Sequence, residues 1–359
     1  MRIAIDASRT TVARVTGTEH YALRLIHTLI QQNSTHHITL YFRDQPPPGL
    51  FPDTDHVVYR IIPLPRLWTH LRFALELWRN RPDITFVPAH TLPLVFPGRA
   101  IVTVHDLGFK YFPQAHPAGQ RYYLDWTTRY SARRACVILA DSQATANDLS
   151  RFYGLSSGKI RVVYPGIDTP HLGDTDAIKQ KYHLPERYFL FMGTLQPRKN
   201  IARIVRAFGQ WQQINPDDDT GLVLAGGKGW LYDETWTTGV DGVSLPGYID
   251  EADKGALYAG ATALVFPTLY EGFGFPVLEA MHCGTAVIAS NSSSLPELVG
   301  DAGLLVDPLD VDAISAAMDM ISSDAGLRQQ LRAKGQRQVA KFTWEAAAQA
   351  VLEAFELAM

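Results

Sequence analysis

The sequence is poor in cysteine and holds no long apolar run. Its two cysteines, Cys136 and Cys283, stand far apart and fall in predicted element interiors. Unpaired buried cysteines suit a reducing cytosol, and they argue against a disulfide framework or a thiol zinc site. No apolar run approaches the ~20 residues that are needed to cross a bilayer. The first predicted strand begins at residue 2, so we expect no signal peptide and a cytoplasmic protein.

Three ligand-binding patterns are also missing from the chain. There is no G-x-G-x-x-G fingerprint, so dinucleotide binding has no support. There is no lysine or arginine run and no aromatic-basic module, which argues against nucleic acid as a partner. No clear Asp-x-Asp pair follows a predicted strand, so we expect neither a metal nor another cofactor.

The composition is that of an ordinary folded protein. The 359 residues are 46% hydrophobic and 19% charged, which predicts two domains with a core each. Apolar runs alternate with helical patterns, so we expect an α/β fold with parallel sheets. Proline and glycine cluster at 164–170, where we place a hinge. Strands are predicted at 2–6, 37–42, 57–62, 84–87, 100–104, 136–140, 160–163, 188–193, 221–225, 243–245, 262–266, 286–289 and 303–306.

Charge is distributed unevenly along the chain. Residues 1–168 hold 19 Lys and Arg against 12 Asp and Glu, whereas the remainder holds 14 against 24. The basic N-terminal half could approach an anionic membrane surface or a phosphate-bearing acceptor. The imbalance could equally have no such role, and both interpretations stay open.

A predicted helix at 66–79 lies within this basic half. Its apolar residues fall on one helical stripe among arginines: Leu67, Leu71, Ala74, Leu75 and Trp78. Such a stripe could dock on anionic lipid as a peripheral membrane contact. The helix leads straight into a core strand, however, so we favour packing of the stripe on the N-terminal sheet.

The most informative segment is 269–280, LYEGFGFPVLEA, in which seven residues separate Glu271 from Glu279. A predicted strand precedes it, and Pro276 fits the first turn of a helix that carries Glu279. Backbone N–H groups at such a helix start can receive an anion, while carboxylates can hold sugar hydroxyls. The combination predicts a nucleotide-sugar site.

Further blocks accompany this segment in a fixed order. They are FMGTLQPRKN at 191–200, MHCGTAVIAS at 281–290, LPELV at 295–299 and GLLV at 303–306. Together they resemble the retaining glycosyltransferases of family 4, or group 1, and most closely their mannosyltransferase-like branch. The resemblance implies a GT-B fold, with two Rossmann-like domains whose parallel sheets face an interdomain cleft. Residues 1–168 would bind the acceptor and 169–343 the donor, and a C-terminal helix at 344–359 would cross back to the first domain.

The resemblance assigns roles to residues of the C-terminal half. Arg198 and Lys199 would contact the donor diphosphate beside a helix start, with a solvated basic pair as the alternative. Glu271 would lie near the transferred sugar. Glu279 would hold the ribose hydroxyls, although a helix-terminal acid favoured by the dipole is an alternative. The other implied donor-binding residues are Gly193, Thr194, Tyr248, Ile249, Gly272, Phe273, Gly274 and Phe275, of which Tyr248 could equally be packing.

The N-terminal half carries four further candidates. His105 and Asp106 end a buried strand in VTVHDL at 102–107. The resemblance implies that His105 contacts a donor sugar hydroxyl, although a lone histidine is more often structural. Asp106 would orient His105 or contact the acceptor. Gly17 and Thr18 open a helix and resemble the family's glycine turn near donor and acceptor, respectively.

Ser142 is the last acceptor-binding candidate. It lies in DSQAT at 141–145, which stands where the family has a Ser-Glu-Phe-Ser-like segment. Gln143 replaces the acid of that segment, which weakens the correspondence.

The implied activity is hexose transfer with retention at the anomeric carbon. Mannose from GDP-mannose is the preferred donor, and the acceptor is a glycan or lipid-linked molecule in cell-surface polysaccharide synthesis. We prefer front-face attack without metal, because two cations can neutralise the diphosphate and no carboxylate stands out as a nucleophile. The predicted catalytic residues are His105, Asp106, Arg198, Lys199 and Glu271.

Two other functions are considered. One is a GT-B enzyme that epimerises or hydrolyses nucleotide-sugars, which would turn over its donor without an acceptor. The other is a non-catalytic sugar-binding subunit, and the intact set of Arg198, Lys199, Glu271 and Glu279 argues against it.

Overall fold

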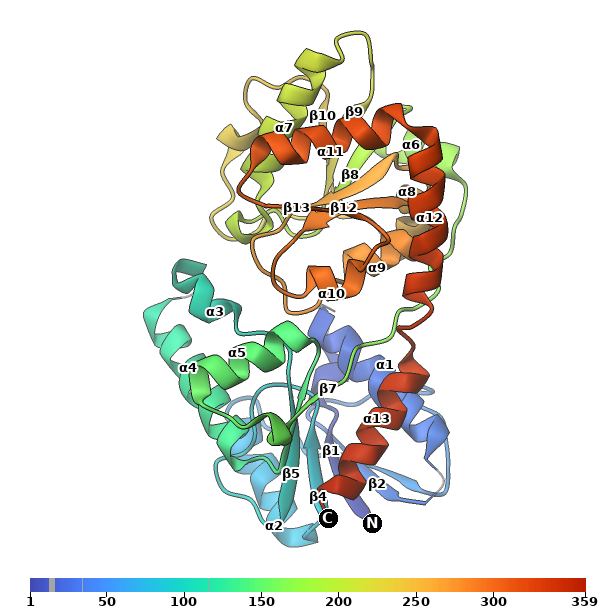
Figure 1. Cartoon of the computed structure of the whole chain (residues 1–359). Coiled ribbons are helices and arrows are strands. Elements are labelled where there is room, and N and C mark those ends of the chain that lie inside the picture. Colours follow the sequence, from blue (N-terminus) through green and yellow to red (C-terminus); the bar gives the residue numbers. More distant parts are fainter. Residues whose placement is uncertain (13–16, 34, 116) are drawn as a thin grey trace. The chain divides into compact units, whose positions relative to one another are not determined.

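Parallel strands alternate with helices along the chain, which confirms the predicted α/β class. The structure is a computed structural model, and it describes residues 1–12, 17–33, 35–115 and 117–359. The chain divides into two compact units. The first is Met1–Gly166 together with Phe342–Met359, and the second is Ile167–Lys341. Figure 1 shows each unit as a sheet flanked by helices.

The first unit is built on a seven-stranded parallel sheet with the order β3-β2-β1-β4-β5-β6-β7. In this sheet Ile3 of β1 lies opposite Ile38 of β2 and Ile84 of β4. The strands are β1 (Arg2–Asp6), β2 (His37–Phe42), β3 (Val57–Ile61), β4 (Ile84–Val87), β5 (Arg99–Val104), β6 (Val137–Ala140) and β7 (Ile160–Val162). The helices and turns are η1 (Ser8–Thr11), α1 (Gly17–Gln32), η2 (Trp68–Phe73), α2 (Ala74–Asn80), α3 (Gly108–Tyr111), η3 (Pro113–Ala115), α4 (Ala118–Arg134), α5 (Gln143–Tyr153), η4 (Ser157–Lys159) and α13 (Trp344–Leu357).

Both faces of this sheet are covered, so its central strands are apolar along their length. Under α1 and α13 the core joins Ile5, Leu25 and Phe355. On the other face a second core contains Phe73 and Leu149, which come from η2 and α5. The sheet is therefore buried between two layers of helices. Polar side chains are accommodated at the ends of its strands.

Helix α13 follows the whole second unit in the sequence, yet it packs on α1 in the first unit (Figure 1). The Thr343 side chain caps it by accepting the Ala346 N–H at 3.1 Å. Gly166 lies directly against its start, because a Cβ at Gly166 would be 2.2 Å from the Trp344 nitrogen. Only glycine lets the chain leave the first unit this close to α13.

The second unit has a six-stranded parallel sheet with the order β10-β9-β8-β11-β12-β13. Its strands are β8 (Tyr188–Met192), β9 (Gly221–Ala225), β10 (Val243–Gly247), β11 (Ala263–Phe266), β12 (Ala286–Ser290) and β13 (Leu304–Val306). Its helices and turns are α6 (Thr175–Tyr182), η5 (Pro197–Lys199), α7 (Ile201–Ile214), η6 (Glu234–Thr237), η7 (Glu251–Asp253), α8 (Lys254–Gly260), α9 (Phe275–His282), α10 (Leu295–Val299), α11 (Val311–Ser323) and α12 (Ala325–Val339). Trp211 of α7 is fully buried against Phe189 of β8, with ring centroids 5.2 Å apart.

Two sequence expectations about side-chain burial are wrong. Of the predicted stripe in 66–79, only Ala74 is buried, and Leu67, Leu71, Leu75 and Trp78 are exposed. The core contacts come instead from Trp68, Phe73 and Leu77, because the segment has apolar residues on two sides and begins with a turn of wider π-helix, η2.

The second wrong expectation concerns the cysteines. Cys283 is buried as predicted, but Cys136 is exposed in the connection that precedes β6. Separately, no helix within the described part of the chain is long and apolar enough to cross a membrane.

Candidate functional site

The candidate site of the second unit lies where the strand order reverses. The chain enters the sheet at β8, adds β9 and β10 on one side, and then returns to add β11, β12 and β13 on the other. The reversal therefore falls between β8 and β11. In open parallel sheets such a point, at the carboxyl ends of the strands, is where ligands bind. The loops that follow β8 and β11 carry Arg198, Lys199 and Glu271.

The loop after β8 is locked into a tight turn before α7. Asn200 takes the left-handed conformation, with φ of 65°, which asparagine tolerates better than most residues. Its side-chain amide donates to the carbonyls of Pro267 and Pro308, at 2.8 and 2.7 Å. The Leu269 N–H donates to the Arg198 carbonyl at 2.9 Å. These bonds hold the Arg198 backbone against the loop that follows β11.

Three of the predicted residues meet in one charge cluster, in which Lys199 and Glu271 are buried and Arg198 is half-buried. The Lys199 ammonium is 2.7 Å from Glu271 Oε1, and Arg198 Nη1 is 3.5 Å from Glu271 Oε2. Lys199 is 9% exposed and Glu271 is 7% exposed. Two cations thus share one carboxylate, so these three side chains together carry one net positive charge. A largely buried charge of this sign favours an anion at the strand ends.

The loop from Glu271 to α9 is shaped by glycine and by two serines. Gly274 has φ of 131°, and a Cβ there would lie 2.6 Å from Leu295 Cδ2. Ser293 Oγ accepts the Glu271 N–H at 3.0 Å, and the Ser294 hydroxyl donates to the Glu271 carbonyl at 3.1 Å. Gly272 and Phe273 are buried, whereas Phe275, which begins α9, is half-buried. The loop is therefore held in one conformation that only glycine at 274 permits.

Glu279 lies on α9 and is oriented by a residue that the sequence analysis missed. The Tyr258 hydroxyl of α8 donates to Glu279 Oε2 at 2.6 Å. Burial raises the pKa of Tyr258 well above its ordinary value, and the Glu279 charge raises it further. Tyr258 therefore keeps its proton and fixes Glu279. No motif marks Tyr258, because in the sequence it reads as an ordinary core position of a helix.

The loops after β8 and β9 meet each other and the last residue of β10 through glycines. Gly193 and Gly226 both have positive φ, of 145° and 134°, and a Cβ on Gly226 would lie 2.0 Å from the Gly193 carbonyl oxygen. The Gly226 N–H donates to the Gly247 carbonyl at 2.7 Å. Thr194, next to Gly193, is exposed. This close contact sets the shape of the surface beside the charge cluster.

The two residues that follow β10, Tyr248 and Ile249, differ in burial. Tyr248 is 74% exposed, so the alternative that it packs in the core is wrong. Ile249 is 2% exposed, and its side chain belongs to the core. The Tyr248 ring is thus accessible at a strand end.

In the first unit, His105 is paired with an aspartate that the sequence did not suggest. His105 Nδ1 is 2.6 Å from Asp141 Oδ2, and Nε2 is 3.1 Å from the Pro88 carbonyl. Both neighbours are hydrogen-bond acceptors, so the ring is doubly protonated when Asp141 is ionised. Burial alone lowers the pKa of His105, but the Asp141 carboxylate raises it above the ordinary value. His105 and Asp141 follow the adjacent strands β5 and β6.

The neighbours of this pair have other partners. His90 Nε2 accepts the His105 backbone N–H at 3.2 Å, and burial with the adjacent His105 charge lowers the pKa of His90 to about 4. Asp106 Oδ1 accepts the Gly108 N–H at 2.7 Å, at the start of α3. Asp141 is therefore a hydrogen-bond partner that orients His105, and the Asp106 charge also raises the pKa of His105. The role of Asp106 in orienting His105 or in acceptor binding stays a prediction.

The remaining N-terminal candidates lie at helix starts. Gly17 and Thr18 are the first residues of α1, and the turn that precedes them, 13–16, lies outside the described residues. Ser142 is buried as the N-cap of α5, where its Oγ accepts the Thr145 N–H at 3.1 Å. Acceptor binding by Thr18 and Ser142 stays a prediction.

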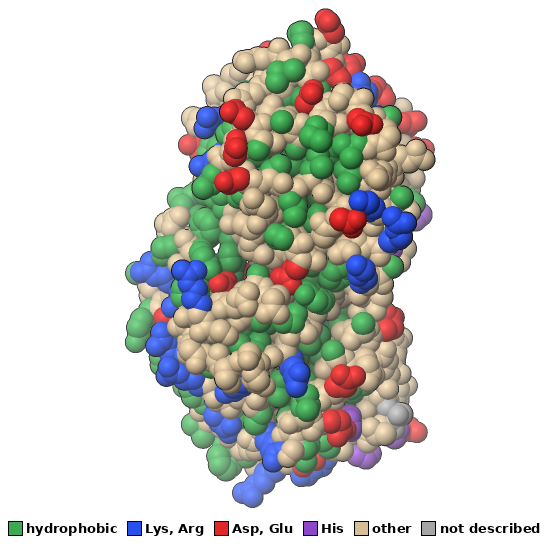
Figure 2. Space-filling view, in the orientation of Figure 1, with side chains coloured by type: hydrophobic (Ala, Val, Ile, Leu, Met, Phe, Trp, Pro, Cys, Tyr) green, Lys and Arg blue, Asp and Glu red, His purple; other side chains and the backbone are tan. Residues whose placement is uncertain are grey.

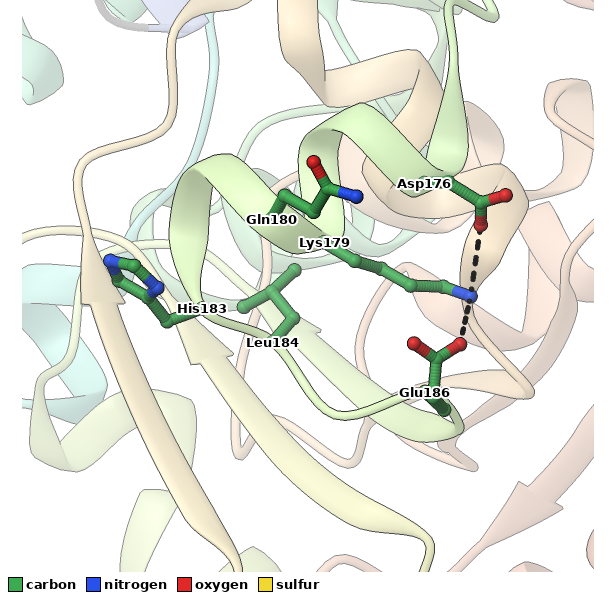
Figure 3. A pocket seen from close by; sticks show the side chains of 6 residues that line it. All are labelled: Asp176, Lys179, Gln180, His183, Leu184 and Glu186. Carbon is green, nitrogen blue, oxygen red and sulfur yellow. Dashed lines mark hydrogen bonds and ion pairs between the residues drawn. The ribbon is translucent and has the colours of Figure 1, made fainter.

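Two further possibilities for a functional site are a metal-binding group and a surface hollow. Across the described ranges of the chain, no group of three His, Cys, Asp or Glu side chains could hold a metal ion. An open hollow of about 460 Å³ lies beside α6 and is lined by Asp176, Lys179, Gln180, His183, Leu184 and Glu186. Figure 3 shows Lys179 reaching between Asp176 and Glu186, at 3.3 and 2.9 Å. No predicted site residue lines this hollow.

Comparison with known proteins matches both halves of the chain. A protein-family model described as glycosyl transferases group 1 matches residues 174–338, and one described as glycosyltransferase family 4 matches residues 15–171. The O-antigen chain mannosyltransferase B of Escherichia coli is 35% identical over 272 residues, which cover 72% of this chain and 70% of that protein. The serotype-specific mannosyltransferase WbdA of Escherichia coli is 28% identical over 259 residues, which cover 67% of this chain but 31% of WbdA.

A solved structure extends the likeness to the whole fold. A sucrose-phosphate synthase from Thermosynechococcus elongatus superposes with a TM-score of 0.77 at 22% identity, covering 99% of this chain and 98% of that one. At this identity the likeness bears on the fold alone. It confirms the predicted GT-B fold.

Proposed function

The chain belongs to the group 1 glycosyltransferases, and from this premise we propose that it is a retaining mannosyltransferase. The donor is GDP-mannose, and the acceptor is a glycan or lipid-linked molecule in cell-surface polysaccharide synthesis. The two named relatives, both mannosyltransferases and one of them acting on an O-antigen chain, support the choice of sugar and pathway. The observation that carries the donor site is the charge cluster of Arg198, Lys199 and Glu271 at the strand reversal.

In the proposed reaction the bond between the anomeric carbon and the diphosphate breaks. The acceptor oxygen bonds to the same face of that carbon, and its proton passes to the departing phosphate oxygen. Arg198 and Lys199 stabilise the negative charge that develops on the diphosphate, and we propose that they do so without a metal. Glu271 holds Lys199 in place and lies near the transferred sugar. Glu279, fixed by Tyr258, accepts from the ribose hydroxyls.

The other predicted residues complete the two binding sites. Glycine backbones at 193, 272 and 274 let the donor approach the main chain closely, and Tyr248 and Ile249 lie at the nucleobase. In the first unit, we propose that the His105 imidazole donates a hydrogen bond to a sugar hydroxyl. Its Nε2–H would exchange the Pro88 carbonyl for that hydroxyl.

The first test is calorimetric titration with GDP, UDP, ADP and TDP in the presence of a chelator. We expect GDP to bind selectively and Glu279→Ala to abolish that binding, because the ribose hydroxyls lose their acceptor. Glu353→Ala, on an exposed helix face, is the matched control and should bind as wild type does. Preference for another nucleotide would show that the donor is not GDP-mannose. Binding that depends on added metal would contradict the metal-free proposal.

A second test follows transfer itself. Lys199→Ala should lower turnover by about 10²-fold or more, because one stabilising donor of the transition state is lost. Lys334→Ala removes an ion pair between a half-buried lysine and the exposed Asp301, and it should leave turnover unchanged. Near-wild-type turnover in Lys199→Ala would sink the diphosphate role. Consumption of donor at the same rate with and without acceptor would instead favour the hydrolase alternative.

We also propose that the basic first unit brings the enzyme to an anionic membrane, where a lipid-linked acceptor would be found. Lysine and arginine side chains are frequent on this unit in Figure 2, whereas acidic side chains predominate on the second unit. Charge of this sign is attracted to a surface of anionic lipid.

A further inference from the structure

One helical segment of the first unit turns an apolar stripe outward. Leu67 directly precedes η2, and Leu71, Leu75 and Trp78 follow it across the continuous η2 and α2 at intervals of four, four and three residues. Their exposed fractions are 62%, 57%, 45% and 47%. The same segment supplies Trp68, Phe73 and Leu77 to the core, and much of the stripe is left at the surface. Four large apolar groups in one line are more than scattered surface residues.

A second helix adds aromatic residues beside this stripe. The Tyr123 hydroxyl of α4 lies 3.0 Å from His70 Nε2 of η2, which joins the two helices. Tyr122 and Trp126 of α4 are 74% and 42% exposed. Figure 2 shows hydrophobic and basic side chains interleaved over the flank where Figure 1 places α4 and α2. Tyrosine and tryptophan are the side chains that favour a membrane–water interface.

The charges around the stripe are almost all positive. Residues 60–81 contain five arginines and a single carboxylate, Glu76. Glu76 is buried and already pairs with Arg72 at 2.5 Å, Arg79 at 3.2 Å and Arg60 at 3.5 Å. One carboxylate for three arginines leaves the rim basic, and it holds those arginines beside the apolar stripe. The arginine-rimmed face consists of Leu67, Leu71, Leu75, Trp78, Tyr122, Trp126, Arg60, Arg66, Arg72 and Arg79.

We propose that the arginine-rimmed face lies on the surface of an anionic lipid bilayer, with the apolar stripe at the level of the headgroups. The inference rests on the membrane contact proposed above and names the surface that makes it. An apolar line with aromatic and arginine neighbours combines the two attractions that hold interfacial helices, burial of apolar area and attraction to anionic lipid. A second copy of this chain fits less well. A two-fold contact would place the same arginines of both copies together.

The test is co-sedimentation of the full chain with vesicles of phosphatidylcholine alone or mixed with phosphatidylglycerol in equal parts. We expect binding to the mixed vesicles that weakens as salt rises. Leu71→Ser with Trp78→Ser should weaken this binding by about tenfold for each lost apolar group. Arg66→Glu should weaken it without changing fold, because Arg66 is exposed.

Matched controls come from the second unit. Ile214→Ser and Arg206→Glu change an exposed isoleucine and an exposed arginine of α7, and both should bind vesicles as wild type does. GDP binding, measured without vesicles, should be unchanged in every variant, since none of these residues belongs to the donor site.

The outcomes separate the two proposals. Wild-type binding that survives Leu71→Ser/Trp78→Ser and Arg66→Glu would overturn the named face and leave the membrane contact standing. Equal binding to both kinds of vesicle would overturn the role of the arginines. No binding of the wild type would overturn the membrane contact as well, whereas mannosyl transfer to a water-soluble acceptor would still be judged separately. A wild-type dimer that dissociates in the double variant would assign the face to a second copy.

Discussion

At the residue scale, the charged side chains of the candidate sites are buried or half-buried, and each is held by a partner. Lys199 is fixed by Glu271, Glu279 by Tyr258 and His105 by Asp141. Burying a charge without a partner costs free energy, so each of these side chains can be buried only because its partner is present. Losing one member should therefore affect the position and the protonation of the other.

His105 and Asp141 allow a test by pH. Because the pKa of His105 is raised, the folded unit holds this proton more tightly than the unfolded chain does. Its stabilising contribution is present at low pH and is lost as pH rises through the folded pKa. In Asp141→Asn burial remains without the carboxylate, so we expect the His105 resonance to titrate at a lower pH than in wild type. The measurement is an NMR titration of the imidazole.

The control for this titration is Asp44→Asn, at an exposed pair with Arg43, which should leave the His105 titration where it is. The contribution of His90 to stability, measured by thermal unfolding, depends on pH in the opposite direction to that of His105. The pKa of His90 is lowered to about 4, so its contribution is lost as pH falls from about 6.5 toward that value. An unchanged His105 titration in Asp141→Asn would contradict the pairing.

At the element scale, glycines determine the conformation of the loops at the strand ends. The sequence shows that glycine is present, but it does not show why glycine is required. The loops after β8 and β9 touch where Gly226 meets the Gly193 carbonyl. A motif search registers only a glycine. The reason for it, a positive φ and a distance too short for a Cβ, depends on two loops that are about 30 residues apart in sequence.

Adjacent glycines provide a matched pair for this contact. Gly226→Ala adds a Cβ at φ of 134° and at 2.0 Å from the Gly193 oxygen, so the two loops must separate. We expect nucleotide affinity to fall by about tenfold or more, together with a lower melting temperature. Gly227→Ala meets no atom within 4 Å and should change neither quantity. Equal effects of the two variants in calorimetry and thermal unfolding would show that the close contact is unimportant.

Strands and helices differ in how far sequence predicted them. Buried parallel strands such as β8 and β11 are short apolar runs between turn signals, so their predicted positions are within a few residues of those observed. The segment at 66–79 has apolar residues on both sides, and periodicity cannot decide which side meets the sheet. Contacts such as Tyr258 with Glu279 or Asp141 with His105 join distant segments, and no local pattern carries them.

At the scale of the whole molecule, the first unit is completed by a segment that follows the second. Phe355 of α13 is fully buried in the first unit's core, where its ring lies 5.7 Å from that of Phe86. Trp344 at the start of α13 is also buried, next to Tyr21 of α1. The stability of the first unit therefore depends on both ends of the chain.

The dependence can be measured within one helix. Phe355→Ala should lower the free energy of unfolding of the first unit by about 3–5 kcal/mol, because it removes a buried ring and leaves a cavity. Leu357→Ala, two residues later and 60% exposed, should change it by about 0.5 kcal/mol or less. Denaturant unfolding followed by hydrogen exchange resolves the first unit from the second. Similar losses for the two variants would mean that α13 is not part of the first unit's core.

The position of α13 also has a consequence for synthesis on the ribosome. The first unit emerges early, but the apolar face that α13 covers must wait until all of Ile167–Lys341 has been translated. The second unit contains all its own strands and can close during that interval. A message that is cut short after residue 341 would therefore yield a folded second unit attached to an unfinished first unit with exposed apolar surface. Proteases and chaperones recognise such surface, so we expect chains that lack α13 to be removed.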